Sequence, residues 1–324
     1  DSPSVSGESV KQALMAAGVP GEQISVKTVH GPKGSTDFVK TWFYGSEGKH
    51  NGGTAPTIGI VGRLGGIGAR PERIGLVSDG DGAVSAVAVA MKLGDMAKKG
   101  DALKGDVFVS THICPNSPTR PHDPVPFMGS PINMTIANRE EMGEELDAVL
   151  SIDTTRGNRI VNTRGFAISP TVKEGWILRV SEDLLEIMSS VTGELPKVFP
   201  LSMTDITPYG NGLYHLNSIL QPCTATKAPV VGVALTSQTT VPGCATDRHR
   251  GGRALRHRDG ESVRRGQVQV LQRGRVRADP QALRSDEQAS GHGRAAAGGS
   301  SGVRGPGHDF ARRDRYHWAN AKSG

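Results

Sequence analysis

The feature that most constrains the fold is an alternation of short apolar runs with helical patterns, which begins at residue 57 and continues to about residue 235. Such alternation is typical of a parallel or mixed sheet with helices on both faces. We therefore predict an α/β fold with a mostly parallel or mixed central sheet and right-handed crossovers. The expected strands are residues 24–29, 38–44, 57–61, 74–78, 106–113, 148–153, 167–169, 197–200 and 229–235, and the expected helices are residues 8–18, 83–99, 138–145 and 181–191.

Charge divides the chain into two parts. Residues 1–246 carry 21 Lys and Arg against 24 Asp and Glu, a net charge of −3, whereas residues 247–324 carry 17 against 8, a net charge of +9. Because the basicity is confined to the tail, we expect no nucleic-acid partner for residues 1–246. Apolar periodicity ends at the same point. We predict one α/β domain over residues 1–246 and a disordered basic tail over residues 247–324.

The tail has a second interpretation. When residues 256–290 are back-translated with permitted codons and read one nucleotide later, the product regains two amphipathic helical patterns around a strand-like segment. Periodicity recovered over such a length favours a reading-frame slip in GC-rich DNA. We hypothesise that the native C-terminal sequence is lost from about residue 247 onward and that the frame-shifted tail is not native.

Cysteine usage and hydropathy predict a compartment. Cys114, Cys223 and Cys244 are too few, and odd in number, for a disulfide framework, which indicates a reducing environment. No run reaches the length of a transmembrane helix, and the first residues lack the basic and apolar regions of a signal peptide. We expect a cytoplasmic protein that has no membrane partner and that can form a homo-oligomer.

Two carboxylates lie where the expected strand 74–78 meets the expected helix 83–99. Asp79 and Asp81 alternate with glycines there. Ligand sites in open α/β sheets collect at the carboxyl ends of strands, where a carboxylate can bridge two cations. A helix cap explains one Asp equally well, but two Asp with flanking glycines exceed what capping needs. Asp153 ends the strand 148–153 and shares this placement, although a turn Asp is its common alternative.

Strand 106–113 ends in a second pair of candidates. His112 and Cys114 are two residues apart, so they share a face, and both are ligands for a borderline-soft metal. A hydrogen-bonded histidine and a small buried cysteine explain the same pair without a metal.

The loop that follows is stiffened by four prolines between residues 115 and 124. It therefore presents Arg120, His122 and Asp123 rigidly. Arg120 can grip a substrate carboxylate in bidentate fashion, and His122 beside Asp123 can act as a ligand or a general base. A local salt bridge that fixes the loop is the structural alternative.

A further polar loop covers residues 204–217. Tyr209, Asn211 and His215 lie among glycines and can close over a ligand and donate hydrogen bonds to it. Alternatively, this is a tight connection whose aromatic side chains fill gaps.

Five stretches closely resemble a bacterial family catalogued only as a domain of unknown function: TIGIVGRLGGIGARPERIGLVSDGDGA, THICPNSPTRPHDPVPFMGSP, SIDTTRGNR, GFAISPTVKEG and DITPYGNGLYHLNSILQP. The resemblance covers most of residues 50–246. It implies membership of that family and no known reaction.

A more remote resemblance is to the di-zinc aminopeptidase and carboxypeptidase superfamily, in which a strand ends in an Asp that bridges two metals and opens a helix rich in small residues. It implies an aminopeptidase-like three-layer sandwich, in which Asp79 or Asp81 matches the bridging Asp and Asp153 matches the later carboxylate ligand. The chain departs from that pattern twice. Gly62-Arg63-Leu64-Gly65 stands where the superfamily has His-x-Asp, and Thr111-His112-Ile113-Cys114 stands where it has an acidic pair. Either His112, His122 and Asp123 have replaced the metal ligands, or the metal has been lost.

These observations lead to one main hypothesis and two rivals. The first is a metal-dependent hydrolase of a small amide or peptide-like substrate, with one or two divalent ions, zinc or manganese, that activate water. The rivals are a metal-free acid–base isomerase or lyase, and a non-catalytic small-ligand-binding module on a degenerate hydrolase fold. The expected metal ligands are Asp79, Asp81, His112, His122 and Asp153; the expected catalytic residues are His112, His122 and Asp123; and the expected substrate-binding residues are Arg120, Tyr209, Asn211 and His215.

Overall fold

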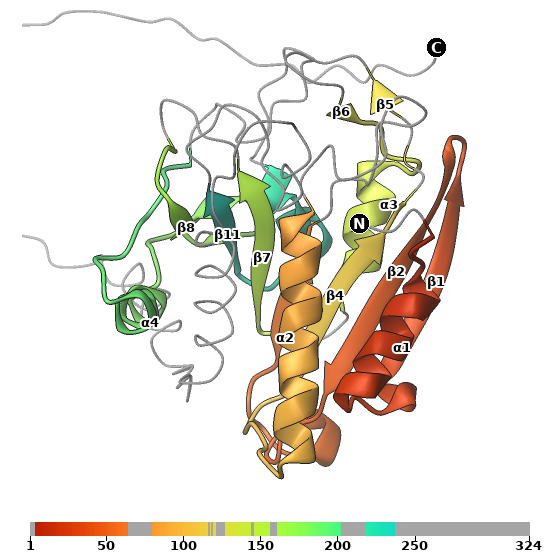
Figure 1. Ribbon diagram of the computed structural model, residues 1–324. Coiled ribbons are helices and arrows are strands. Elements are labelled where there is room, and N and C mark those ends of the chain that lie inside the picture. The colour runs from red at the N-terminus through yellow and green to blue at the C-terminus, as the bar shows by residue number, and fades with distance from the viewer. Residues whose placement is uncertain are drawn as a thin grey trace, which may run out of the picture. The chain divides into compact units, whose positions relative to one another are not determined.

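A computed structural model of the chain (Figure 1) describes residues 4–63, 80–115, 117, 119–120, 127–143, 146–155, 161–201 and 218–236. For residues 119, 120, 127, 128 and 218 it describes the backbone alone. The chain falls into two units, Asp1–Ala278 and Asp279–Gly324, and every described residue belongs to the first. The described residues end at residue 236, so the tail with its proposed frame slip lies outside them, and that hypothesis stays a prediction.

The first unit is built on a mixed nine-stranded sheet with the order β1-β2-β4-β3-β7-β11-β9-β10, in which β8 also pairs with β11. The strands β4, β3, β7 and β11 run parallel to one another, so their carboxyl ends meet at one edge, here called the carboxyl edge. The mixed sheet confirms the predicted α/β class. Its strands are β1 (Ile24–Gly31), β2 (Gly34–Phe43), β3 (Ile58–Gly62), β4 (Val107–Ile113), β7 (Ala148–Thr155), β8 (Gly165–Ile168), β9 (Val172–Lys173), β10 (Trp176–Ile177) and β11 (Val230–Thr236), and β5 (Thr119–Arg120) pairs separately with β6 (Phe127–Met128).

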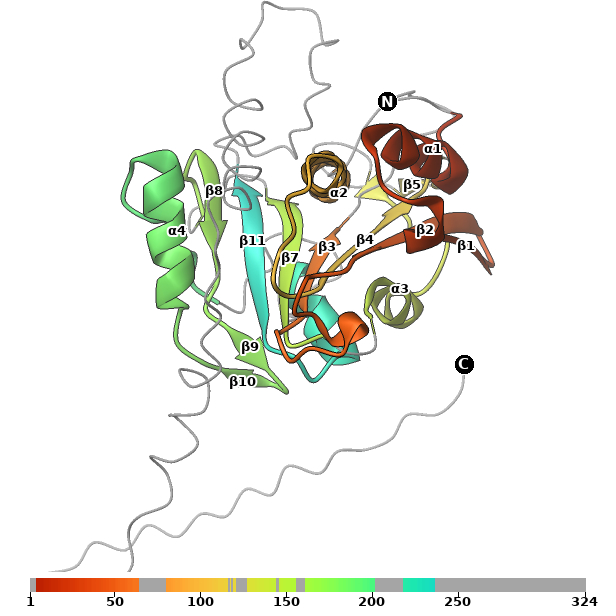
Figure 2. The same ribbon diagram turned by 90° about the horizontal axis from the view of Figure 1, so that it is seen from below.

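Helices cover both faces of the sheet, which gives three layers (Figure 2). On one face, α1 (Gly7–Ala17) and α2 (Asp81–Lys98) bury Leu14, Val89 and Leu93 against the strands. On the other face lie α3 (Met134–Glu141) and the 3-10 helix η3 (Ser218–Ala225). Three further helical segments complete the described residues: α4 (Glu182–Thr192), η1 (Gly21–Gln23) and η2 (Lys49–Asn51).

Most of the expected elements form where the periodicity placed them, and two do not. Helix α3 begins at Met134 rather than at 138, because the Asn133 side chain caps it by accepting the N–H groups of Thr135 (2.7 Å) and Ile136 (3.2 Å). The expected strand 197–200 is a single bridge between Val198 and β8. The expected strand 74–78 lies outside the described residues. No helix in the described part of the chain has both the length and the apolar character needed to cross a bilayer.

Asp106, the residue before β4, fixes the long loop between β2 and β3. Its buried carboxylate accepts the backbone N–H of Gly45 at 2.8 Å and that of His50 at 3.1 Å. Backbone donors shielded from water need a partner, and here one carboxylate supplies the bonds that strand pairing supplies elsewhere.

Candidate functional site

Three polar side chains form one row across the sheet at the carboxyl edge. In the strand register, Gly62 of β3 pairs with Thr111 on one side and Ile152 on the other. The next residue, Arg63, therefore lies between His112 of β4 and Asp153 of β7, and its backbone N–H bonds the Ile152 carbonyl at 2.8 Å.

All three side chains of this row point to the face covered by α3 and η3. Val61 and Val149 belong to the core cluster that η3 closes, and Arg63 and Asp153 follow them at even spacing. His112 lies against Phe38, with ring centroids 5.4 Å apart, and Phe38 packs on Ala137 of α3. Arg63, His112 and Asp153 are all buried.

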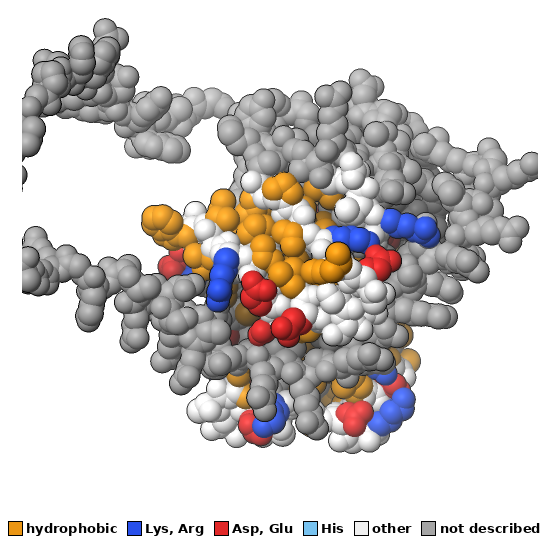
Figure 3. Space-filling view, turned by 90° about the vertical axis from the view of Figure 1, so that its left-hand side faces the viewer, with side chains coloured by type: hydrophobic (Ala, Val, Ile, Leu, Met, Phe, Trp, Pro, Cys, Tyr) orange, Lys and Arg blue, Asp and Glu red, His pale blue; other side chains and the backbone are white. Residues whose placement is uncertain are grey.

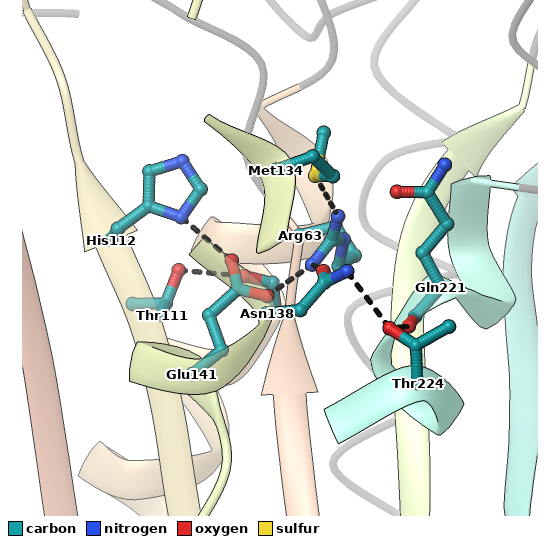
Figure 4. Close-up of polar contacts among 9 residues, drawn as sticks. Arg63, Thr111, His112, Met134, Asn138, Glu141, Gln221 and Thr224 are labelled. Atoms are coloured by element: carbon teal, nitrogen blue, oxygen red, sulfur yellow. Dashed lines mark hydrogen bonds and ion pairs between the residues drawn. The ribbon is translucent and has the colours of Figure 1, made fainter. Parts of the chain in front are cut away.

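Glu141, at the end of α3, joins two members of this row (Figure 4). Its side chain has no exposed surface. One carboxylate oxygen, Oε1, lies 2.8 Å from Nδ1 of His112, and the other, Oε2, accepts Nη1 of Arg63. The result is a buried cluster in which the Glu141 carboxylate binds both the Arg63 guanidinium and the His112 imidazole.

The rest of α3 completes the cluster. Arg63 Nη1 also donates to Asn138 Oδ1 at 2.9 Å, and Nη2 lies 3.1 Å from the Met134 sulfur. Asn138 in turn donates to the Thr224 hydroxyl of η3 at 3.4 Å. Met134, Asn138 and Glu141 are three or four residues apart, so they share one face of the helix. The cluster thus ties both cover segments to the sheet.

Burial and charge act on Glu141 in opposite directions. Burial raises the pKa of its carboxyl, but the Arg63 guanidinium and the His112 contact outweigh burial and leave that pKa below its usual range. Glu141 is therefore an acceptor, and Nδ1 of His112 carries the proton of their hydrogen bond. In a neutral ring the lone pair is then on Nε2, which points away from Glu141, toward the carboxyl edge (Figure 4). Within the described part of the chain, Nε2 has no hydrogen-bond partner.

A histidine oriented in this way has two chemical uses. A carboxylate on one ring nitrogen fixes the tautomer and raises the basicity of the other, as is usual for histidines that bind metals. The same arrangement suits a general base. Both uses need the Nε2 atom.

Buried hydroxyls add polar capacity near the row. Among the described residues, Ser110, Ser151, Thr154 and Thr155 have buried hydroxyl oxygens without a hydrogen-bond partner. Thr154 and Thr155 end β7, directly after Asp153. Because an unpaired buried hydroxyl is costly, each is a candidate for contact with a ligand or an ordered water.

The structure brings three of the predicted site residues to the carboxyl edge. Asp81 is the first residue of α2, and a Cβ added at its neighbour Gly82 would lie 2.4 Å from the carbonyl oxygens of both Arg63 and Ile152. Asp153 is buried, and its Oδ1 accepts the N–H of Thr154 at 2.8 Å. Together with His112 these residues lie near the strand ends, but within the described residues no three His, Cys, Asp or Glu side chains form a group that could hold a metal.

Two further predicted residues, Arg120 and Cys114, lie in and just before the segment that follows β4. The backbone of Arg120 lies in β5, opposite Phe127. Cys114 lies 3.3 Å from the Ser117 hydroxyl, and burial raises the pKa of its thiol. The predicted site residues outside the described residues are Asp79, His122, Asp123, Tyr209, Asn211 and His215.

Sequence reasoning missed Arg63, Asn138 and Glu141. Arg63 directly follows an apolar strand, and a charged residue at that point was a usable signal. Glu141 had none, because Glu140 beside it is chemically identical and instead binds Lys27 at 2.6 Å.

Comparison with known proteins places the chain in a family. The family model described as "Protein of unknown function (DUF1177)" matches residues 27–253. No match is found among curated proteins.

Several solved structures share features of the fold at low similarity. The bottromycin maturation enzyme BotP is 15% identical, with a TM-score of 0.43 over 83% of this chain and 65% of that one. Leucyl aminopeptidase from Trypanosoma cruzi is 12% identical, with a TM-score of 0.40 over 83% and 57%. The LapA aminopeptidase of Legionella pneumophila is 11% identical, with a TM-score of 0.40 over 82% and 62%. The chain thus spans less than two thirds of each of these proteins.

Proposed function

The chain belongs to the DUF1177 family, as its sequence motifs indicated, and we propose that it is a hydrolase of a small amide or peptide-like substrate with its reaction centre at His112. The observation that carries the proposal is the orientation of His112: Glu141 holds Nδ1 at 2.8 Å, and Nε2 points to the carboxyl edge. Ligand sites of open α/β sheets lie at this edge.

In this proposal a divalent metal, zinc or manganese, is the cofactor. His112 Nε2 fits such an ion, since a buried carboxylate orients the ring. Asp81, Asp153, Asp79 and His122 are the further ligands proposed from the sequence. When bound, the metal would lower the pKa of a water molecule.

The chain's own residues have separate tasks in the proposed reaction. Glu141 fixes the His112 tautomer, and Arg63 keeps Glu141 ionised. The buried hydroxyl of Thr155, two residues after Asp153 and on the same face of β7, offers a polar contact to the substrate. Arg120 is proposed to bind a substrate carboxylate, and His122 and Asp123 to assist proton transfer.

A metal-free acid–base reaction is the second candidate. It is favoured by Arg63, whose charged group lies on the same carboxylate as His112, at the point where the di-zinc pattern has a ligand. Here Nε2 of His112 takes the proton directly, as the base of an isomerase or lyase.

One set of variants tests both. The full chain, loaded separately with zinc and with manganese and in a metal-free form, is assayed on a panel of dipeptides and N-acyl amino acids, and its bound metal is measured by elemental analysis. His112→Gln should abolish turnover. If the metal proposal is correct, it should also lower the metal content, and Glu141→Gln should weaken metal affinity about 10–100-fold.

A matched control is His30→Gln, which changes an exposed histidine of β1. Turnover that persists without metal and disappears in His112→Gln supports the second candidate. Full activity of His112→Gln contradicts both.

A further inference from the structure

A strip of exposed apolar side chains lies at the end of the sheet beyond β11. Trp176 and Ile177 of β10 are 75% and 60% exposed, and Leu178 follows them. Leu195 and Val198, after α4, are also exposed. Figure 3 shows hydrophobic side chains gathered on this side of the molecule, with charges of both signs around them. Contiguous apolar surface of this kind marks an interaction site.

The backbone of β10 is also open to a partner. Trp176 pairs with Lys173 of β9, and the Leu178 N–H donates to the Thr171 carbonyl at 2.8 Å. Because hydrogen-bonded positions alternate along an antiparallel pair, the N–H and C=O of Ile177 point away from β9. Within the described residues, β10 is the last strand of the sheet, so these two groups face an open edge. Such an edge is a template for another strand.

We propose that β10 pairs with β10 of a second copy of the chain, antiparallel about a two-fold axis at Ile177, to form a homodimer. In this register the two Ile177 residues exchange both backbone hydrogen bonds. Trp176 of each copy lies opposite Leu178 of the other, which makes two aromatic–aliphatic cross-strand pairs on one face. The contact is isologous, as closed two-fold symmetry requires.

Charge favours a second copy as the occupant. The same register places Arg179 opposite Gly175 of the second copy, next to its Glu174, and the symmetry repeats this contact. Lys173 belongs to β9, on the side of β10 that faces away from the second copy. Two antiparallel copies of this segment match each other in apolar contacts and in charge. The segment should therefore pair with a second copy in preference to an unrelated strand.

Cross-linking tests the two-fold axis directly. In a hydrogen-bonded antiparallel pair the Cα atoms lie about 5.5 Å apart, within the disulfide range of about 4.4–6.8 Å. The full chain carrying Ile177→Cys should therefore form a covalent dimer under mild oxidation. The parent chain shows any cross-linking by native cysteines, and Met15→Cys, at a position 41% exposed on α1 at the opposite end of the sheet, shows random collision. Cross-linking of Ile177→Cys no faster than that of Met15→Cys would overturn the proposal.

Sedimentation velocity provides an independent readout. The parent chain should be dimeric, and Trp176→Glu should raise the dimer Kd at least roughly tenfold. Met15→Glu, on α1 at the opposite end of the sheet, is the control and should leave Kd unchanged. Arg179→Glu should weaken the dimer, and the added change Glu174→Lys should restore it. Circular dichroism checks that each variant is folded. A parent chain that stays monomeric up to about 100 μM would also refute the dimer.

Discussion

The buried contact between Arg63 and Glu141 supports a quantitative prediction. Glu141 has no exposed side-chain surface, and the Arg63 side chain is 7% exposed. Removing one partner of such a pair costs about 3–5 kcal/mol, because the other charge stays in a medium that solvates it poorly. We expect a loss of this size in the free energy of unfolding for Glu141→Gln and again for Arg63→Met.

The double variant distinguishes the pair from two independent contacts. Arg63→Met with Glu141→Gln removes both charges, so its loss should be smaller than the sum of the single losses by at least about 2 kcal/mol. Urea unfolding followed by circular dichroism measures all four proteins. Glu194→Gln, which breaks the exposed Lys197 contact of 2.8 Å, is the control and should change nothing measurable. Losses that add to within about 0.5 kcal/mol would refute the assignment of a coupled buried pair.

The same cluster predicts the acid side of the stability curve. The pKa of Glu141 is lowered in the folded state, so its contribution is present above the unfolded value of about 4.3 and is lost as pH falls through the folded value. In Arg63→Met the guanidinium that opposes the effect of burial is removed, so the pKa of Glu141 in the folded state should be higher than in the parent. Protonation at low pH should therefore cost this variant less stability than it costs the parent, so its free energy of unfolding should fall less between pH 7 and pH 3, as measured by urea unfolding. Acid limbs of equal depth in the two proteins would contradict the cause given for the shift.

Three further predictions concern other parts of the fold. Gly82→Ala should destabilise the protein by roughly 1–3 kcal/mol in thermal unfolding, although alanine normally favours a helix, because the new Cβ meets two backbone carbonyls at 2.4 Å; the exposed position Val84→Ala is the control, and a gain in stability would contradict the packing. Asp106→Ala should lower the free energy of unfolding by about 1–3 kcal/mol for each backbone N–H that it leaves without a partner. A free energy of unfolding in urea equal to that of the parent would refute this role. Cys114 and Cys223 should alkylate far more slowly at pH 8 in the folded protein than in urea, since burial raises both thiol pKa values; equal labelling by mass spectrometry would contradict their burial.

Sequence periodicity predicted the sheet and most helices because those signals are local. Apolar residues of β4 and β7, and those of α2 and α4, repeat with the spacing of their own elements. The hairpin β9–β10 gave no such signal, since its strands have two residues each. The glycine at position 175 was the one local sign of a turn there. In the structure Glu174 and Gly175 both adopt positive φ, at 48° and 87°, as a tight hairpin turn requires.

The site was less predictable because its contacts join distant parts of the chain. Asp81, His112 and Asp153 were recognised as residues at strand or helix ends, and that placement is local. The partner of His112 is 29 residues away on α3, and the partner of Arg63 is 78 residues away. A one-residue change of helix register would exchange Glu141 for Glu140, so only the folded packing decides which carboxylate is buried.

The place of Arg63 in the row explains how the site keeps a usable histidine. A lone buried Glu141 would carry an uncompensated charge beside His112. The ion pair between Arg63 and Glu141 is neutral by itself, so Glu141 does not require a charge on the imidazole. His112 can then bond Oε1 through Nδ1 as a neutral ring and keep the lone pair of Nε2 for a metal or a proton. In the proposed histidine-centred site Arg63 is thus a positioning residue, which acts on His112 through Glu141.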